Sequence, residues 1–146
     1  MIFISATRLR LKSLIYLPKF IISNELSVKR LKKTPGFLYG RELIEKNLTF
    51  WTLTMWNTET DMKVFRNSMP HRKAMQKLPI WCDESAFVHW MQEDQQPPNW
   101  KIVYEKILSE GRISNVRNPS QYHLSKNYPT IKWTKLERNF KPVGKN

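Results

Sequence analysis

Cysteine, glycine and long apolar runs are scarce in this chain of 146 residues. The single cysteine, Cys82, excludes an internal disulfide and a CxxC pair, and three scattered histidines give no zinc-binding pattern. Four glycines are too few for a glycine-rich phosphate loop, and no nucleophile elbow or paired-carboxylate motif occurs, which argues against kinases and hydrolases. Arg8, Arg10 and Lys12 interrupt the apolar start, and no apolar stretch approaches the roughly 18 residues that span a bilayer. We therefore expect a cytoplasmic protein without a transmembrane segment.

Aromatic residues and basic charge are abundant instead. The chain has six tryptophans, 40% apolar residues and a net charge of +13, which favours one folded domain over disorder. Residues 1–50 and 101–146 each carry ten Lys or Arg against three acidic residues, whereas residues 51–100 carry five against six. Such basic ends permit binding to RNA, an anionic membrane or an acidic partner, but an ordinary solvated surface is the favoured explanation. Nucleic acid is not favoured, because the charge is not concentrated on one element.

Strand patterns occur at four places in the sequence. Residues 2–11, 37–44 and 48–56 alternate in polarity or are rich in β-branched and aromatic residues, which predicts three strands. The second and third of these are close enough to form a hairpin. Residues 100–108 are expected to form a fourth strand.

Helix signals lie between these strands. One helix is expected from Pro18 to the residue before Pro35. Thr58 and Asp61 form a capping pattern for a second helix, and Pro70 is expected to interrupt it before a further helical stretch. Asp83 is expected to cap a third segment, on which three side chains share one face: Phe87, Trp90 and Met91.

The resulting order, β-α-β-β-α-β, predicts an α+β fold over residues 1–108. It is a ferredoxin-like four-stranded antiparallel sheet with helices on one face. The strands are apolar on both faces, so the face without helices needs a cover, and a homodimer supplies it. Residues 109–146 form a basic C-terminal extension. Its aromatic residues indicate that it packs on the domain or on its dimer partner: Tyr122, Tyr128, Trp133 and Phe140.

Residues 49–75 are the most informative stretch, because an aromatic strand leads into a helical region with methionines and one histidine. Aromatic walls and methionines are typical of an apolar ligand pocket. Trp51 and Trp56 differ in strand parity, so one should face the helices and the other the dimer seam. The predicted ligand-binding residues are Trp51, Trp56, Phe65, Arg66, Met69 and Met75. A plain core explains the apolar residues as well, and a solvated side chain explains the arginine.

His71 is the candidate catalytic residue. It lies at the start of a helical segment, where the positive helix end disfavours an imidazolium and leaves a neutral ring. Such a ring could exchange protons with a substrate or ligate a haem iron, and the alternative is a histidine that only caps the helix. His89 and His123 lack a comparable setting. Cys82 is expected to be a buried, inert thiol.

Three motifs resemble a known superfamily: Pro35-Gly36-Phe37 through Gly40, then Thr49-Phe50-Trp51 with Trp56, then Met69-Pro70-His71. They are similar to the dimeric α+β barrel proteins, nearest to the spheroidene monooxygenase-like and antibiotic-biosynthesis-monooxygenase-like branches. The resemblance implies a homodimer with a ligand cavity between the sheet and the helices of each subunit. Members include cofactor-free oxygenases of aromatic polyketides and haem-dependent enzymes, so the resemblance implies either no cofactor or haem.

These observations predict a small-molecule-binding dimeric α+β barrel protein that acts as a monooxygenase on a hydrophobic or aromatic substrate. Oxygenation without a metal requires an electron-rich substrate anion, which the protein positions, shields from water and deprotonates. Two alternatives remain open: a non-catalytic binding or regulatory dimer, and a binder of nucleic acid or an anionic surface through the basic termini.

Overall fold

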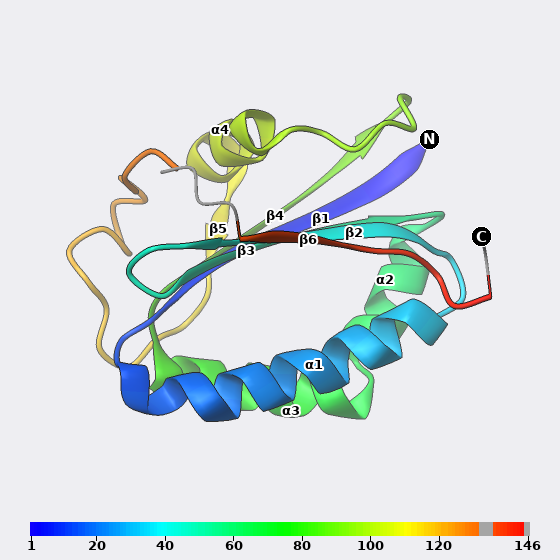
Figure 1. Cartoon of the computed structure of the whole chain (residues 1–146). Coiled ribbons are helices and arrows are strands. Elements are labelled where there is room, and N and C mark those ends of the chain that lie inside the picture. The colour runs from blue at the N-terminus through cyan, green and yellow to red at the C-terminus, as the bar shows by residue number, and fades with distance from the viewer. Residues whose placement is uncertain (132–135, 145–146) are drawn as a thin grey trace.

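Antiparallel pairing joins six strands into one sheet in the computed structural model, which describes residues 1–131 and 136–144 (Figure 1). The order across the sheet is β5 (Arg112–Ile113), β4 (Cys82–Gln92), β1 (Ile2–Leu11), β3 (Thr49–Trp56), β2 (Phe37–Glu45) and β6 (Glu137–Phe140). The central strand β1 pairs with β3 and β4, and β2 folds back on β3. The predicted ferredoxin-like fold is confirmed, and the short edge strands β5 and β6 add to its four strands.

Three helices cover one face of the sheet: α1 (Leu17–Lys33), α2 (Glu59–Arg66) and α3 (Met69–Trp81), with a 3-10 turn (Leu14–Tyr16) ahead of α1. Thr58 caps α2, because its Oγ1 accepts a hydrogen bond of 3.1 Å from the backbone N–H of Asp61. Pro70 starts α3, and in a first turn its missing N–H breaks no helical hydrogen bond. None of the helices in the described ranges is long and apolar enough to cross a membrane.

The predicted helix after Asp83 is wrong. Residues 82–92 form β4, which runs antiparallel to β1 along almost its whole length. Phe87, Trp90 and Met91 have helical spacing by coincidence. The same segment also has the two-residue alternation of a strand: Glu84, Ala86 and Val88 are buried and turn toward one side of the sheet.

The predicted strand at residues 100–108 is also wrong, because these residues lie in α4 (Trp100–Glu110). Asn99 caps this helix by accepting a hydrogen bond of 3.0 Å from the backbone N–H of Ile102. Trp100, Val103 and Ile107 form its buried stripe at helical spacing. The β-branched residues suggested a strand, but the Asn99 cap and the helical spacing of the buried residues favour a helix.

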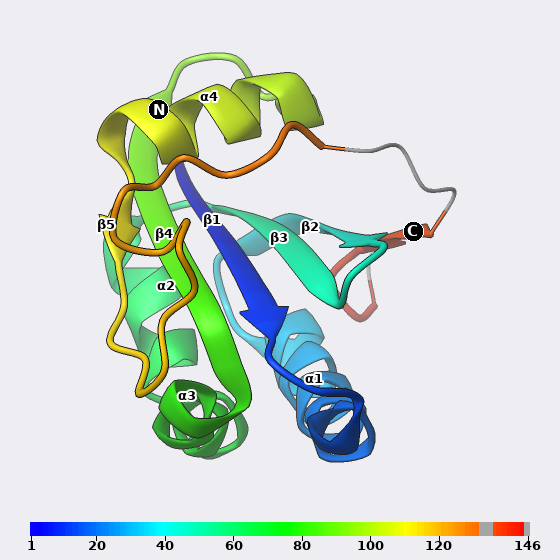
Figure 2. The same cartoon turned by 90° about the vertical axis from the view of Figure 1, so that its left-hand side faces the viewer.

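Helix α4 and the segment after β5 cover the second face of the sheet (Figure 2). One core cluster joins Trp51, Leu53 and Met55 of β3 to Trp100, Val103 and Ile107 of α4, together with Tyr128. We call this side of the sheet the packed face. The sequence-based reason for a homodimer was an uncovered apolar face, and that reason does not hold, because the chain covers this face itself.

Polar contacts fasten the segment after β5 to the packed face. Arg8 Nη1 donates to Glu84 Oε2 at 2.6 Å, and the guanidinium carbon lies 4.1 Å from the ring centroid of Tyr128. Ser120 Oγ donates to Glu84 Oε1 at 2.7 Å, and the backbone N–H of Ser85 donates to Nδ1 of His123 at 3.2 Å. Trp133, predicted to pack in this extension, lies outside the described residues.

Candidate functional site

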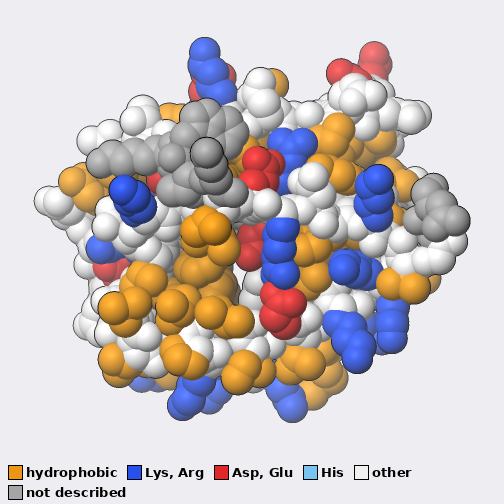
Figure 3. Space-filling model, in the orientation of Figure 1, with side chains coloured by type: hydrophobic (Ala, Val, Ile, Leu, Met, Phe, Trp, Pro, Cys, Tyr) orange, Lys and Arg blue, Asp and Glu red, His pale blue; other side chains and the backbone are white. Residues whose placement is uncertain are grey.

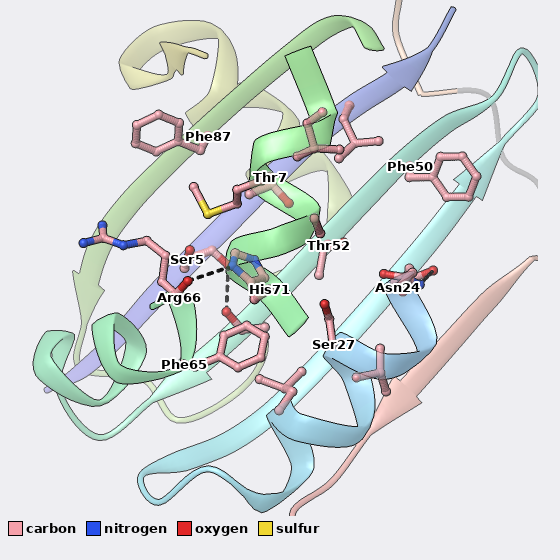
Figure 4. Close-up of a pocket in the computed structure, with 18 of the residues that line it drawn as sticks. Ser5, Thr7, Asn24, Ser27, Phe50, Thr52, Phe65, Arg66, His71 and Phe87 are labelled. Atoms are coloured by element: carbon pink, nitrogen blue, oxygen red, sulfur yellow. Dashed lines mark hydrogen bonds between the residues drawn. The ribbon is translucent and has the colours of Figure 1, made fainter. Parts of the chain in front are cut away.

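A cavity of about 260 Å³ lies between the sheet and helices α1 and α3 (Figure 4). Its floor is the side of β1, β3 and β4 that faces the helices, which we call the hollow face. Helix α1 forms one wall, and α2 and α3 form the other. The apolar lining includes these side chains: Phe20, Val28, Leu31, Phe50, Phe65, Leu78 and Phe87.

Small hydroxyl side chains explain why this face is hollow. On β1, Ser5 lies opposite Thr54 of β3, and Thr7 lies opposite Thr52. Serine and threonine fill less volume than the tryptophan, leucine and methionine that the same strands present to the packed face. Helices that rest on larger side chains around this floor therefore leave a space above it, and the floor of that space is polar.

Ser27 faces the floor from α1 (Figure 4). The residue is 7% exposed, and its Oγ has no hydrogen-bond partner in the part of the chain that the structure describes. A buried hydroxyl without a partner costs about 1–3 kcal/mol. A polar atom of a bound molecule at this position would satisfy it.

His71 stands at the start of α3 and lines the cavity. Its Nδ1 lies 3.2 Å from the carbonyl oxygen of Arg66, and because a carbonyl only accepts, Nδ1 carries the proton. Burial lowers the pKa of His71, the Arg66 cation lowers it further, and the hydrogen bond to the carbonyl opposes both. The ring is therefore neutral near pH 7, and its Nε2 keeps a lone pair that no described residue engages.

Arg66 and His89 complete this end of the cavity. The ring of His71 packs on Phe65 at a centroid distance of 4.7 Å, and His89 lies opposite Ser5 on the neighbouring strand. Burial lowers the pKa of His89, and Arg66 lowers it as well. Arg66 thus acts electrostatically on both imidazoles. A substrate anion formed here would meet one cation and two neutral rings.

A buried carboxylate closes the opposite end. Asn24 Nδ2 donates to both carboxylate oxygens of Glu42 at 3.1 Å, and Arg138 Nη2 lies 3.6 Å from one of them. The cavity is therefore polar at both ends and along its floor, with aromatic walls between.

The structure gathers four predicted site residues at the cavity: Phe65, Arg66, His71 and Met75. The prediction that Trp51 and Trp56 occupy opposite faces is confirmed, because Trp51 lies on the packed face and Trp56 lies on the helix side. Neither indole lines the cavity. Met69 is exposed and also lies outside the lining.

Sequence reasoning missed the hydroxyl floor, Ser27 and His89. The alternation of Ser85, Phe87 and His89 was a usable signal, but it was lost when residues 82–92 were interpreted as a helix. The floor residues on β1 and β3 were visible only as polar positions between apolar ones. Their spatial grouping depends on the register between strands, which the sequence does not state.

The cavity does not fit a haem. Its volume of about 260 Å³ is below the roughly 300–1,000 Å³ of sites for drug-sized ligands, and a haem macrocycle is larger than most such ligands. Across residues 1–131 and 136–144, no cluster of three or more His, Cys, Asp or Glu is placed to hold a metal ion. We derive no chemical step through either group.

Comparison with known proteins supports the fold. No family profile matches the sequence, and no curated protein matches it at a significant level. Among solved structures, a putative antibiotic biosynthesis monooxygenase from Nitrosomonas europaea aligns with a TM-score of 0.57 and 11% identity, over 66% of this chain and 94% of that one. SnoaB, a cofactor-independent oxygenase from Streptomyces nogalater, aligns with a TM-score of 0.54 and 11% identity, over 66% and 98%. Rv0793 from Mycobacterium tuberculosis aligns with a TM-score of 0.59 and 6% identity, over 66% and 100%.

The chain has the ferredoxin-like α+β fold of these structures. These structures are matched almost end to end, whereas about a third of this chain has no counterpart in them. At such low identity the likeness concerns the fold alone, so the chemistry of the site rests on its own residues.

Proposed function

We propose that this protein binds a small, mainly apolar molecule in the hollow-face cavity and oxidises it with dioxygen, with His71 as the proton acceptor. The observation that carries the proposal is the state of His71: a neutral imidazole, oriented by the Arg66 carbonyl, whose Nε2 lone pair meets no partner among the described residues. SnoaB, a cofactor-independent oxygenase, has the same fold, so the fold is compatible with this chemistry.

The lining favours a flat ring system that carries oxygen. Phe20, Phe50 and Phe65 offer ring and edge contacts to an aromatic body. The hydroxyl floor and the unpartnered Oγ of Ser27 offer hydrogen bonds to keto or hydroxyl groups on that body. A phenol or an enolisable aromatic ketone would fit both the aromatic walls and the hydroxyl groups of the floor.

The proposed reaction balances with dioxygen as the sole oxidant. His71 Nε2 takes a proton from a ring CH₂ that is conjugated with a carbonyl through the flanking aromatic rings, and the Arg66 cation stabilises the anion that forms. The anion passes one electron to dioxygen, and recombination of the two radicals gives a hydroperoxide after proton return from His71. Loss of water from the hydroperoxide then leaves a new carbonyl, so that one substrate and one O₂ give one ketone and one H₂O.

Anthrone is a suitable probe, because one O₂ converts it to anthraquinone and water. We expect anthrone to raise the melting temperature and the wild-type protein to take up dioxygen with it. The variant His71→Asn should keep the thermal shift and lose turnover by about 100-fold or more. Ala74→Leu, which places three extra carbons in the cavity, should lose both readouts.

Two results would redirect the proposal. If anthrone and a panel of phenols leave the melting temperature unchanged, the cavity does not bind this class of molecule. If they bind without dioxygen uptake above the rate in buffer, the protein is the non-catalytic binder that the sequence left as an alternative.

The homodimer expected from the sequence is a separate proposal. It would have to form through surfaces other than the packed face, since α4 and the segment after β5 occupy that face. Sedimentation velocity at micromolar concentration tests it, and a species with the mass of one chain would contradict it.

A further inference from the structure

The outer side of α1 combines exposed aliphatic residues with lysines. Ile22 and Leu26 are 63% and 54% exposed, and Lys29 and Lys33 continue the same stripe at helical spacing. This stripe lies opposite the buried residues that α1 turns toward the cavity. Leu14 and Ile15, in the 3-10 turn just before α1, are exposed as well.

Helix α3 lies beside α1 and extends this surface (Figures 1 and 2). Lys73 and Lys77 are exposed on the side of α3 that is turned away from His71 and Leu78. Together α1 and α3 carry eight Lys or Arg and one acidic residue, Glu25. Glu25 is paired with Arg138, so this surface offers almost uncompensated positive charge.

The space-filling view shows both components on one side of the molecule (Figure 3). Hydrophobic side chains gather over the first part of α1, and Lys and Arg side chains lie along the lower edge, beneath the helices of Figure 1. We define the lipid-facing surface as Leu14, Ile15, Ile22 and Leu26 with four exposed lysines: Lys29, Lys33, Lys73 and Lys77.

We infer that this lipid-facing surface docks on an anionic phospholipid bilayer. Interfacial helices pair aliphatic residues that enter the acyl boundary with lysines that meet the headgroups, and this surface has both. A second copy of the chain is a poor occupant, because it would bring the exposed lysines of one copy against the same lysines of the other. A nucleic acid would be expected to meet aromatic rings for stacking, whereas the exposed residues here are aliphatic.

The position of the cavity suggests why the protein would bind a bilayer. The same two helices line the cavity with their opposite sides, so the lipid-facing surface lies directly beyond the ligand site. An apolar ligand that partitions into a bilayer would be concentrated beside the helices that enclose it. The inference concerns the surface alone and holds whether or not the bound molecule is oxidised.

Vesicle sedimentation tests the inference without any ligand. We expect the protein to sediment with vesicles of phosphatidylcholine and phosphatidylglycerol at low salt, but not with phosphatidylcholine alone. The double variant Ile22→Gln/Leu26→Gln should weaken partition by about tenfold or more, because two aliphatic side chains no longer leave water. Lys29→Gln/Lys73→Gln should weaken it by a similar factor, at roughly fivefold per charge.

Matched variants at other positions distinguish binding through this surface from non-specific adsorption to the vesicles. Ile102→Gln/Leu124→Gln removes two exposed aliphatic residues from α4 and the segment after β5, and Lys46→Gln/Lys101→Gln removes two exposed lysines outside α1 and α3. Both should leave partition within about twofold of wild type. Absence of binding to anionic vesicles would overturn the inference, as would equal losses in the matched variants. The inference would also be overturned if the protein bound anionic and neutral vesicles equally and bound single-stranded RNA tightly.

Discussion

The two faces of one sheet differ in what fills them. On β3, Trp51 is fully buried on the packed face, while its neighbour Thr52 forms part of the floor of the hollow face. The same alternation separates Ala6 from Ser5 and Thr7 on β1. The packed face receives α4 and Tyr128, which fill the space against it, whereas the hollow face receives helices that leave a cavity.

This difference separates stability from function within the same strands. Large apolar side chains and a buried ion pair fill the space on the packed face. Small polar side chains on the other face forgo such contacts and keep a space with directed hydrogen-bonding groups. We therefore expect changes on the packed face to alter stability strongly, and changes on the hollow face to alter ligand binding instead.

The largest effect is expected from Glu84→Gln. This change leaves the buried Arg8 without its carboxylate partner, and loss of one member of a buried pair costs about 3–5 kcal/mol. Urea unfolding followed by tryptophan fluorescence measures the free energy of unfolding. Thr52→Val on the hollow face is the matched change, since it also replaces one polar group by a near-isosteric one, and its effect should be much smaller.

A double variant sharpens this test. Arg8→Leu/Glu84→Leu removes both charges, so it should lose less stability than Glu84→Gln alone. If Glu84→Gln and Thr52→Val lower the free energy of unfolding equally, the packed face is not the main source of stability and the proposed difference between the faces is wrong.

The next largest effect is expected from added volume. Ala6 is fully buried on the packed face, so Ala6→Leu should cost about 1–3 kcal/mol through overpacking. Ala74 borders the cavity, so Ala74→Leu should change the free energy of unfolding by less than about 0.5 kcal/mol while abolishing the thermal shift with anthrone. Equal destabilisation by both leucines would show that the hollow face is as tightly filled as the packed face.

The core of the fold could be predicted from the sequence because its signals were local. Proline and Thr58 mark the starts of α1 and α2, and alternation marks β1 and β2. The errors at residues 82–92 and 100–108 arose where local signals conflicted: spacing that suits a helix occurred in a strand, and β-branched residues occurred in a helix. Residues 82–92 form a strand because they pair with β1, and residues 100–108 form a helix that buries Trp100. Both are tertiary effects.

The candidate site was predictable only in part for the same reason. His71, Phe65 and Arg66 lie within a few residues of one another, so the motif that contains them already suggested a pocket. Ser27 and His89 come from distant elements and join the site only through the register of β4 and the placement of α1. The cover of the packed face was missed because α4 had been assigned to the sheet itself.

A smaller effect is expected from pH, and on the packed face it depends on His123. Burial lowers the pKa of His123, and a hydrogen bond to the Ser114 backbone, with the carboxylates of Glu84 and Asp83, only partly opposes this. The unfolded chain therefore binds the proton first, so the stability from this neutral ring is complete above pH about 6.5 and is lost as pH falls toward the folded-state pKa. Protonation also removes the acceptor for the N–H of Ser85, so the segment around His123 should loosen.

Limited proteolysis between pH 7.5 and pH 5 measures this loosening. We expect cleavage within residues 114–131 to increase at the lower pH in the wild-type protein. In His123→Asn, whose side chain does not titrate, the rate should not vary with pH beyond the variation of the protease itself. His71→Asn serves as the hollow-face control and should retain the wild-type increase, because His71 makes no contact with this segment. A pH-independent wild-type rate would contradict the assignment.

The last comparison concerns Cys82, which belongs to a third core cluster and lies at the junction between α3 and β4. Burial raises the pKa of this thiol to about 12, and the Asp83 carboxylate raises it further. The thiolate is the reactive form, so alkylation by iodoacetamide at pH 8 should be about a thousandfold slower than for a free cysteine. Concentrated guanidinium chloride should restore the ordinary rate, which shows that the thiol itself is intact. Rapid alkylation of the native protein would mean that the junction between α3 and β4 opens readily, and the cavity would then share solvent access with the core beside it.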